Sequence, residues 1–438
     1  MASSEDRNKL HFVLFPLMQQ GHMIPMIDMA RLFAERNIIV TIVTTPANSM
    51  RFKNGVDRSV EAGLSIQLLI LPFPSAEKTG LPQGCENIDA LPSLELANKF
   101  LNATTSLQEP FEQSFVDLKP LCSHNILQSK ILESSTLSLS EPFIVPGLPD
   151  QIKIRKALLP RTLYQSSEDL KDFCDQIREA ERTAYGVVVN SFQELETLYA
   201  EEYLKAKFGK VWCIGPVSLC NKEILDKAER GNKASIDENK CLKWLDSKDP
   251  CSVGYACFGS LCTLTSSEMI ELALGLEASK CSFVWVIRGG ERHPELESWL
   301  HKENFEERNK DTGLLIKGWA PQVLILSHRS IGGFLTHCGW NSTVEGVCAG
   351  VPLIAWPTGG EQFFNEKQIV QVLDIGVKAV NKIMEEGKEG EERRRRARDF
   401  GRRAKKAMEE GGSSHYNMTL LIKDIMQFQA KREQPYQV

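Results

Sequence analysis

The sequence predicts an α/β fold with two domains, and three observations lead to this prediction. A chain of 438 residues is long enough to fill two hydrophobic cores. Short apolar runs alternate with helical patterns: Leu10–Leu17 is followed by a helix that ends near Asn37, and then by the β-branched run Ile38–Thr45. A polar stretch, Val217–Asn239, separates two such series. Strands that alternate with helices favour parallel, doubly wound sheets.

Composition and charge exclude several classes of protein. Hydrophobic residues make up 42% of the chain and charged residues 25%, as in ordinary soluble domains. The net charge of −5 argues against a nucleic-acid partner. The 12 cysteines stand without any CxxC pair, which indicates reduced thiols rather than a disulfide framework. The polar N-terminus and the short apolar run after it match neither a secretory signal nor a membrane span. We therefore expect a cytoplasmic monomer without stable membrane insertion.

The N-terminal half is predicted to have a shortened sheet, because no apolar run of β-strand character lies between Leu71 and Phe143. Its loops are expected at Phe143–Pro149 and Ile152–Pro160. The other elements predicted here are a strand at Leu64–Phe73, helices within Leu91–Leu118, a helix at Asp169–Ala184, and strands at Tyr185–Phe192 and Val211–Pro216.

A second series of strands and helices begins at Cys241. One helix is expected to start near Thr265, whose hydroxyl can cap the first backbone amides. The arginine run within Glu389–Glu410 favours a solvated helix face over a nucleic-acid patch, because glutamates precede arginines by four residues. The strands predicted in this half are Val253–Leu261, Phe283–Arg288, Leu314–Gly318, Ile331–Leu335, Val351–Pro357 and Gly376–Val380, and a last amphipathic helix covers Leu420–Phe428.

The stretch from Trp319 to Gln362 predicts an anion-binding site. The apolar strand Ile331–Leu335 leads into the turn His337-Cys338-Gly339, and a helix opens directly after it. A strand, a tight glycine turn and a helix N-terminus bring free backbone N–H groups and the positive end of the helix dipole to one place. Negatively charged ligands such as phosphates are therefore expected to bind there.

Polar residues around this turn add detail to the prediction. Asn341 or Ser342 is expected to cap the helix, with Glu345 in its first turn. The next strand, Val351–Pro357, ends in the polar cluster Gly359-Gly360-Glu361-Gln362. Ligands of open α/β sheets bind at the carboxyl ends of the strands, so this cluster belongs to the same candidate site.

These residues resemble the signature box of plant family 1 UDP-sugar-dependent glycosyltransferases. The span from Trp319 to Gln362 has the family's box length of 44 positions (362 − 319 + 1). So many residues at fixed spacings are far more specific than a lone glycine motif. The matching residues are Trp319, Pro321, Gln322, His328, Phe334, His337, Gly339, Trp340, Asn341, Ser342, Glu345, Gly350, Pro352, Pro357, Glu361 and Gln362.

The resemblance implies a GT-B fold, in which two Rossmann-like domains face each other across a cleft. Residues 1–216 would form the acceptor-binding domain, 217–240 a linker and 241–410 the UDP-sugar domain, and the helix in 411–438 would pack back on the first domain. UDP-glucose would be the donor substrate, with no further cofactor and no metal. The acceptor would be a small lipophilic molecule such as a flavonoid, cytokinin, steroid or triterpenoid.

The resemblance also implies roles for individual donor-site residues. Trp319, Ala320 and Gln322 would hold uracil and ribose, and Glu345 would accept hydrogen bonds from the ribose hydroxyls. The diphosphate would lie against Ser260, His337, Asn341 and Ser342, and the sugar against Trp340, Glu361 and Gln362. The closing Gln362 goes with glucose in this family. Turn or core packing is the alternative for Ser260 and the tryptophans.

His22 is the predicted catalytic base. It lies in the expected loop Met18–His22, and an imidazole with a pKa near neutrality can take a proton from a hydroxyl group. The alternative is a histidine that only caps or packs at a helix start, but the QGHMIPM context matches the base of the family. Gly21 and Gly360 would line the acceptor.

The chain departs from the family after Pro120. On the order of 35 residues, one βαβ unit, are missing before Leu121. That unit carries the aspartate of a D-x-x-x-P-W pattern that orients the catalytic histidine, and Asp117 is a poor substitute for it. A second gap follows Val380. Three readings stay open: an impaired glucosyltransferase, a catalytically silent nucleotide-sugar-binding relative, and a chain that does not fold stably.

Overall fold

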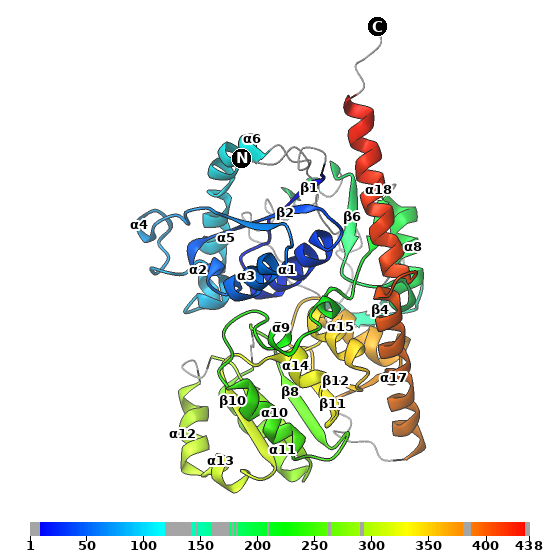
Figure 1. Cartoon of the computed structure of the whole chain (residues 1–438). Helices are drawn as coiled ribbons and strands as arrows, with labels where there is room; N and C mark the ends of the chain where they lie inside the picture. Colours follow the sequence, from blue (N-terminus) through cyan, green and yellow to red (C-terminus); the bar gives the residue numbers. More distant parts are fainter. Residues whose placement is uncertain are drawn as a thin grey trace. The chain divides into compact units, whose positions relative to one another are not determined.

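The structure is a computed structural model, and it divides the chain into two compact units. Unit 1 comprises Met1–Ser129, Ser166–Asn221 and Lys406–Val438, and unit 2 comprises Lys130–Gln165 and Lys222–Lys405. Both are shown in Figure 1. The structure describes residues 9–118, 142–145, 148–158, 175–176, 179–180, 183–207, 210–261, 264–289, 293–379 and 387–433.

Unit 1 begins with a three-stranded parallel sheet in the order β1-β2-β3. The strands are β1 (His11–Leu14), β2 (Ile39–Thr44) and β3 (Ile66–Ile70), and α1 (Gln20–Ala34) connects the first two. β2 is almost wholly buried because it pairs on both sides, whereas β1 pairs only with β2 among the described strands and is half-buried. The apolar strand β1 is thus an edge of this sheet in the described part of unit 1.

A separate two-stranded parallel sheet of β6 (Gly186–Val189) and β7 (Lys210–Cys213) completes the strands of unit 1. The long helix α18 (Ser413–Glu433), red in Figure 1, packs against β7 and α8 (Gln193–Lys207). Its Phe428 ring lies 4.7 Å from the ring of Tyr185. In the described residues no strand joins this sheet to β1-β2-β3.

The remaining helices of unit 1 surround β1-β2-β3 or carry the chain onward. In the described residues they are α2 (Pro46–Ser49), α3 (Lys53–Glu61), α4 (Ala76–Thr79), η2 (Ile88–Ala90), η3 (Leu94–Leu96), α5 (Ala97–Thr105), α6 (Gln108–Leu118) and η6 (Val217–Cys220).

Unit 2 is built on a six-stranded sheet in the order β10-β9-β8-β11-β12-β13, with all pairs parallel. The strands are β8 (Val253–Cys257), β9 (Ser282–Ile287), β10 (Gly313–Lys317), β11 (Ile331–Thr336), β12 (Leu353–Ala355) and β13 (Gly376–Lys378). The central strands are buried on both faces, as expected for a sheet covered by helices. On one face Trp285, Phe283 and Phe305 form the centre of the core.

Helices of unit 2 precede, connect and follow the strands of this sheet. They are α9 (Ile224–Ala228), α10 (Glu238–Asp246), α11 (Ser266–Ala278), α12 (Pro294–Lys302), α13 (Phe305–Arg308), α14 (Gln322–Leu326), α15 (Trp340–Ala349), α16 (Gln362–Lys367), the π-helical turn η8 (Gln368–Val372) and α17 (Lys388–Met408). The predicted cap of α11 is confirmed, because Thr265 and Glu268 form a reciprocal capping box. No described helix is long and apolar enough to cross a membrane.

Two expectations about local structure are wrong. The first concerns the segments expected as loops near Phe143 and Ile152, which contain a short antiparallel pair, β4 (Pro142–Ile144) with β5 (Lys153–Arg155). The stretch Val217–Asn239, expected as a linker, includes the change from unit 1 to unit 2 and also contains η6 and α9, with several buried residues.

The second correction concerns the first helix, which begins at Gln20 and therefore includes His22 in its first turn. The backbone N–H of His22 donates to the Gln19 carbonyl at 2.9 Å, and the helix starts three residues before the expected start at Met23. The junction at Pro120 and the gap after Val380 lie outside the described residues, as does most of Asp169–Ala184.

Candidate functional site

The turn between β11 and α15 has the geometry of an anion site. Cys338 adopts a left-handed backbone (φ 65°), and Gly339 precedes the first helical residue with φ −59° and ψ 144°. The N-cap residue is Gly339, which has no side chain to cap the helix, so the prediction that Asn341 or Ser342 is the cap is wrong. Both lie inside the helix, whose first backbone N–H groups have no intrahelical acceptor. The uncapped end is what a bound anion would require.

His337 is partly buried at this turn, between two glycines. A Cβ atom on Gly259 would lie 2.6 Å from the His337 ring, and one on Gly339 would also fall well inside van der Waals contact. Burial lowers the pKa of His337 to about 4, so the ring is neutral near pH 7. Its Nδ1 atom is buried without a hydrogen-bond partner. An unpaired buried nitrogen beside an uncapped helix end indicates that a ligand completes the site.

We expect Gly339→Ala to reduce the free energy of unfolding by about 1–3 kcal/mol, because the new methyl group overlaps the His337 ring. The backbone at this position suits any residue, so the overlap is the main cost. Gly359→Ala is the control, since a Cβ there meets nothing within 4 Å. Chemical denaturation measures both. In a His337→Ala background the cost should shrink, and an unchanged cost would contradict this account.

Glu345 and Gln322 form a hydrogen-bonded pair next to the turn. Gln322 Nε2 donates to Glu345 Oε2 at 2.8 Å and to Ser342 Oγ at 3.1 Å. The Tyr255 hydroxyl, 3.4 Å away, orients the Gln322 carbonyl oxygen. Glu345 is only 6% exposed and lies in the second turn of α15, so its predicted place in the first turn is wrong. There its carboxylate contacts Gln322, the first residue of α14.

The same carboxylate is bound by a residue that the sequence did not single out. Arg230 Nη1 lies 2.5 Å from Glu345 Oε1, and both side chains are at least nine-tenths buried. Arg230 falls in the stretch interpreted as a linker, where one charged residue among many carries no distinguishing pattern. An arginine beside glycine in the segment Glu229–Gly231 was the only available sign.

Trp319 and Ala320 follow β10 at the same edge of the sheet. The Arg288 guanidinium lies 4.6 Å from the centroid of the indole ring and thereby covers one of its faces. The indole is half-buried, its Nε1 atom has no partner, and Ala320 is buried beside it. Two hydrogen bonds with Ser235 hold the backbone of Trp319: its N–H donates to Ser235 Oγ at 2.9 Å, and its carbonyl oxygen accepts from the Ser235 backbone N–H at 2.8 Å. The ring is therefore fixed in position as a platform.

Glu361 and Gln362 stand at the start of α16. Gln362 Oε1 accepts from the backbone N–H groups of Thr358 and Gly359, at 2.9 Å and 3.2 Å, so its side chain shapes its own loop. Glu361 is exposed. Asn365 Nδ2 donates to the Cys338 carbonyl oxygen at 2.8 Å, which ties α16 to the His337 turn.

Three further predicted residues lie at this end of unit 2. Ser260 follows β8 and is half-buried, and β8 pairs with β11, the strand that leads to His337. Trp340 is half-buried at the start of α15. Gly360 has a left-handed backbone (φ 61°) with open space where a side chain would be. The structure thus brings the predicted donor-site residues to the carboxyl edge of one sheet.

His22 and Gly21 lie in unit 1, exposed in the first turn of α1. Although the ring is exposed, partial desolvation lowers the pKa of His22 below its ordinary value. Among the described residues no carboxylate forms a hydrogen bond or ion pair with this ring. The structure therefore shows a candidate base without a described partner that would fix its tautomer.

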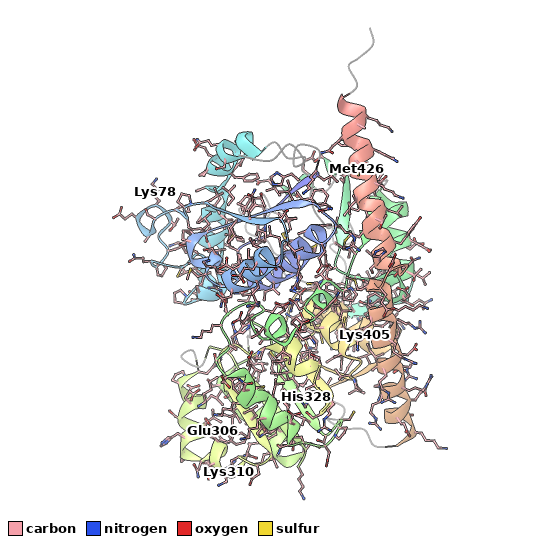
Figure 2. All side chains as sticks on the ribbon, viewed as in Figure 1. Lys78, Glu306, Lys310, His328, Lys405 and Met426 are labelled. Carbon is pink, nitrogen blue, oxygen red and sulfur yellow. The ribbon has the colours of Figure 1, made fainter. Side chains whose placement is uncertain are left out.

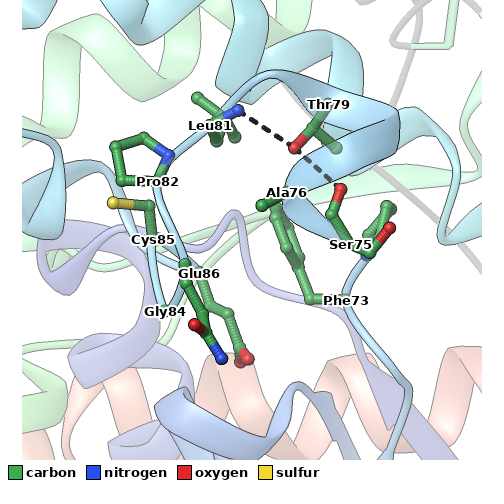
Figure 3. Close-up of a pocket in the computed structure, with 11 residues that line it drawn as sticks. Phe73, Ser75, Ala76, Thr79, Leu81, Pro82, Gly84, Cys85 and Glu86 are labelled. Atoms are coloured by element: carbon green, nitrogen blue, oxygen red, sulfur yellow. Dashed lines mark hydrogen bonds between the residues drawn. The ribbon is translucent and has the colours of Figure 1, made fainter.

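Other features of the structure are not part of this arrangement. His328, labelled in Figure 2, has both ring nitrogens engaged, with Ser330 Oγ at 2.8 Å and Asp246 Oδ1 at 3.2 Å, and therefore packs β11 against α10. The pocket in Figure 3 is lined by residues 73–76, 79 and 81–86 of unit 1, none of them a predicted site residue. Within the described residues no group of three or more His, Cys, Asp or Glu could hold a metal ion.

Comparison with known proteins gives the family. The family described as UDP-glucoronosyl and UDP-glucosyl transferase matches residues 239–387. UDP-glycosyltransferase 73C3 of Arabidopsis thaliana is 48% identical, over 95% of this chain and 96% of its own length. UDP-glycosyltransferase 73C11 of Barbarea vulgaris is 46% identical, over 95% and 97%. The first alignment runs over 480 positions and the chain has 438 residues, so at least 42 positions (480 − 438) have no residue of this chain.

Solved structures agree with these relatives. The crystal structure of Glycyrrhiza uralensis UGT73P12, complexed with glycyrrhetinic acid 3-O-monoglucuronide, matches with a TM-score of 0.86 and 33% identity, over 97% of both chains. That of Arabidopsis thaliana UGT89C1, complexed with UDP-L-rhamnose, matches with a TM-score of 0.70 and 31% identity, over 95% of this chain and 99% of that one. Homologues of this chain thus bind UDP-sugars and small-molecule acceptors.

Proposed function

Because this chain belongs to the plant family 1 UDP-glycosyltransferases, whose GT-B fold it shares, we propose that it transfers glucose from UDP-glucose to a hydroxyl group of a small lipophilic acceptor. The observation that carries the proposal is the turn at His337. The helix α15 begins there without a side-chain cap at its N-cap residue, and the buried Nδ1 atom of His337 has no hydrogen-bond partner among the described residues. The acceptors proposed are flavonoids, cytokinins, steroids and triterpenoids.

The nucleotide is proposed to lie along the carboxyl edge of the unit 2 sheet. Uracil stacks on Trp319, with Ala320 and Gln322 at its edge, and the ribose hydroxyls donate to Glu345. A carboxylate suits this position because, when ionised, it only accepts hydrogen bonds. The rigid backbone pairing of Trp319 with Ser235 and the hydrogen bond from Gln322 to Glu345 support these roles.

The diphosphate is proposed to bind at the start of α15. The backbone N–H groups there, with Ser260, Asn341 and Ser342, surround the oxygens that become more negative as the sugar departs. His337 is neutral because of its burial, so it contributes a hydrogen bond rather than a charge. These dipoles need no reorganisation during the reaction, which is how such a site would stabilise the leaving group.

The sugar is proposed to contact Trp340, Glu361 and Gln362. Gln362 keeps its carbonyl oxygen on the loop at Thr358 and Gly359, so its amide N–H groups stay available for a sugar hydroxyl. The open space at Gly360 leaves room for the acceptor. Gln362 is the basis for proposing glucose.

The proposed chemistry is an inverting displacement. His22 takes the proton of the acceptor hydroxyl, the oxygen forms a bond to C1 of glucose, and the C1–O bond to the diphosphate breaks, so that UDP leaves with the electron pair. The lowered pKa keeps His22 neutral and able to accept a proton near pH 7. Gly21 lies beside it in the first helical turn.

We further propose that turnover is impaired by an internal gap after Pro120. The relatives' alignment contains at least 42 positions without a residue of this chain, which supports a missing segment. His22 has no carboxylate partner among the described residues, and β1 is left as a half-buried edge. In serine proteases, loss of the aspartate that orients the catalytic histidine lowers the rate by about 10⁴.

The second candidate function is nucleotide-sugar binding without catalysis. It is favoured by the contrast between the two units: the donor residues of unit 2 are assembled, whereas His22 in unit 1 lacks a described partner. Such a protein would bind UDP-glucose and release no UDP.

UDP release by the purified chain tests both candidates. With UDP-glucose and a panel of flavonols, cytokinins and triterpenoids, we expect slow release that His22→Ala abolishes. Turnover equal to that of full-length relatives would contradict the proposed impairment. UDP binding by calorimetry with no release at all would favour the silent binding protein, and a chain that neither binds UDP nor melts cooperatively would exclude both.

A further inference from the structure

We propose that the segment Arg230–Ser235 is part of the nucleotide site, in which Arg230 positions Glu345 for the ribose and Ser235 positions Trp319 for the base. This inference rests on the proposed function and extends it to residues outside the signature box. The sequence assigned this segment to a polar linker, yet it contacts both ends of the nucleoside site.

The first contact is the buried ion pair between Arg230 and Glu345. The arginine is 10% exposed and the carboxylate 5%, and the two are 2.5 Å apart. A buried carboxylate that loses its cation partner is left uncompensated, which is unfavourable. Arg230 therefore holds the Glu345 carboxylate in this position, and a carboxylate can accept hydrogen bonds from two ribose hydroxyls.

The Glu345 carboxylate keeps acceptor positions for the ribose hydroxyls. Arg230 binds Oε1 of Glu345, and Gln322 binds Oε2 at 2.8 Å. Two carboxylate oxygens offer about four acceptor positions, so about two remain after these bonds. With one donor on each oxygen, the plane of the carboxylate is fixed, and the remaining lone pairs point in set directions. Arg230 thus orients the group that would read the ribose.

The second contact joins Ser235 to Trp319. Ser235 Oγ accepts from the Trp319 backbone N–H at 2.9 Å, and the Ser235 backbone N–H donates to the Trp319 carbonyl oxygen at 2.8 Å. Gly318 has a left-handed backbone (φ 124°), and a Cβ atom on it would overlap Ser235 Oγ. A glycine is therefore required directly before Trp319, because the segment lies against the chain at that position.

The segment is anchored independently of the nucleotide. It follows α9, which packs against α14, the helix that begins with Gln322. Gly231 within it adopts φ 95°, so the chain turns sharply after Arg230. Both contacts thus come from one segment of six residues. The helix before this segment packs against α14, the helix that begins with Gln322. The arginine is a positioning residue, because it would act on the ribose through Glu345.

The test compares the affinities of UDP and 2′-deoxy-UDP by calorimetry. We expect the wild-type chain to prefer UDP by about tenfold or more, because one hydrogen bond to a charged group is lost with the 2′-hydroxyl. Arg230→Gln should reduce this preference to less than about threefold, as should Glu345→Gln. Arg230→Lys should retain part of it.

Arg396→Gln is the matched control. It removes an arginine of the same unit whose Nη2 atom lies 2.6 Å from Asp374 Oδ2 and which forms no part of the proposed nucleotide site. It should leave the preference for UDP unchanged. If Arg230→Gln does not melt cooperatively, Arg230→Lys supplies the same measurement.

The outcomes separate the inference from the proposed function. If Arg230→Gln weakens both nucleotides equally and keeps the wild-type preference, Arg230 is merely structural and the inference is wrong. If Glu345→Gln loses the preference while both Arg230 variants keep it, the inference fails and the proposed function stands. If the wild-type chain binds neither nucleotide, both fail.

Discussion

Inserting the D-x-x-x-P-W segment of a full-length family member after Pro120 is expected to raise turnover by up to about 10⁴-fold. The segment would supply the carboxylate that His22 lacks among the described residues, and in serine proteases removal of the equivalent partner costs about this factor. It would also offer β1 a neighbouring strand on its open side, which should raise stability. UDP release and thermal melting measure the two effects.

Two controls make this result specific. The gain should disappear when the inserted aspartate is changed to asparagine, and when His22 is changed to alanine. UDP affinity should stay the same in every variant, because the donor residues lie in unit 2. A stable insertion variant that binds UDP but turns over no faster would show that the proposed gap after Pro120 does not limit catalysis.

Acidification from pH 7 to pH 4 is expected to lower the free energy of unfolding of the wild-type chain by about 3 kcal/mol more than that of the His337→Gln variant. Burial lowers the pKa of His337 from 6.5 to about 4. Between these values the unfolded ring binds a proton and the folded ring does not, so the free energy of unfolding falls as the pH falls. At 1.36 kcal/mol per pKa unit, the difference is about 3 kcal/mol.

Denaturant unfolding of both variants at pH 7, 5.5 and 4 measures this difference. The lowered pKa of His22 affects both variants equally and therefore cancels. The glutamine cannot be protonated in this range but keeps a polar side chain at the turn. Parallel stability curves for the two variants would show that the ring is hydrated or paired in the folded state.

Much of the fold could be predicted from the sequence, because periodicity is a local property. The strands of unit 2 were expected within a few residues of their observed bounds, and the cap at Thr265 was expected from its hydroxyl. Composition was a poorer guide where a segment is polar but packed. The stretch Val217–Asn239 was interpreted as a linker for that reason, although η6 and α9 lie within it.

Predictions from local sequence were also wrong next to His22 and His337, the two histidines of the proposed site. The loop was expected to extend to His22, yet the helix begins at Gln20. Asn341 and Ser342 have the side chains of helix caps, but the helix after His337 starts without one. An uncapped end costs stability unless something binds there, which is the kind of exception expected at a functional site.

The sequence by itself determined the alternation of strands and helices and the family to which the chain belongs, because both are carried by residue type and spacing along the chain. Only the tertiary structure decided that Gly259 and Gly339 enclose the His337 ring, and that Arg230 reaches Glu345. These contacts join residues 78 and 115 positions apart (337 − 259 and 345 − 230), and they depend on how parallel strands and their loops meet at one edge of a sheet. No local pattern in the sequence predicts contacts between residues so far apart in the chain.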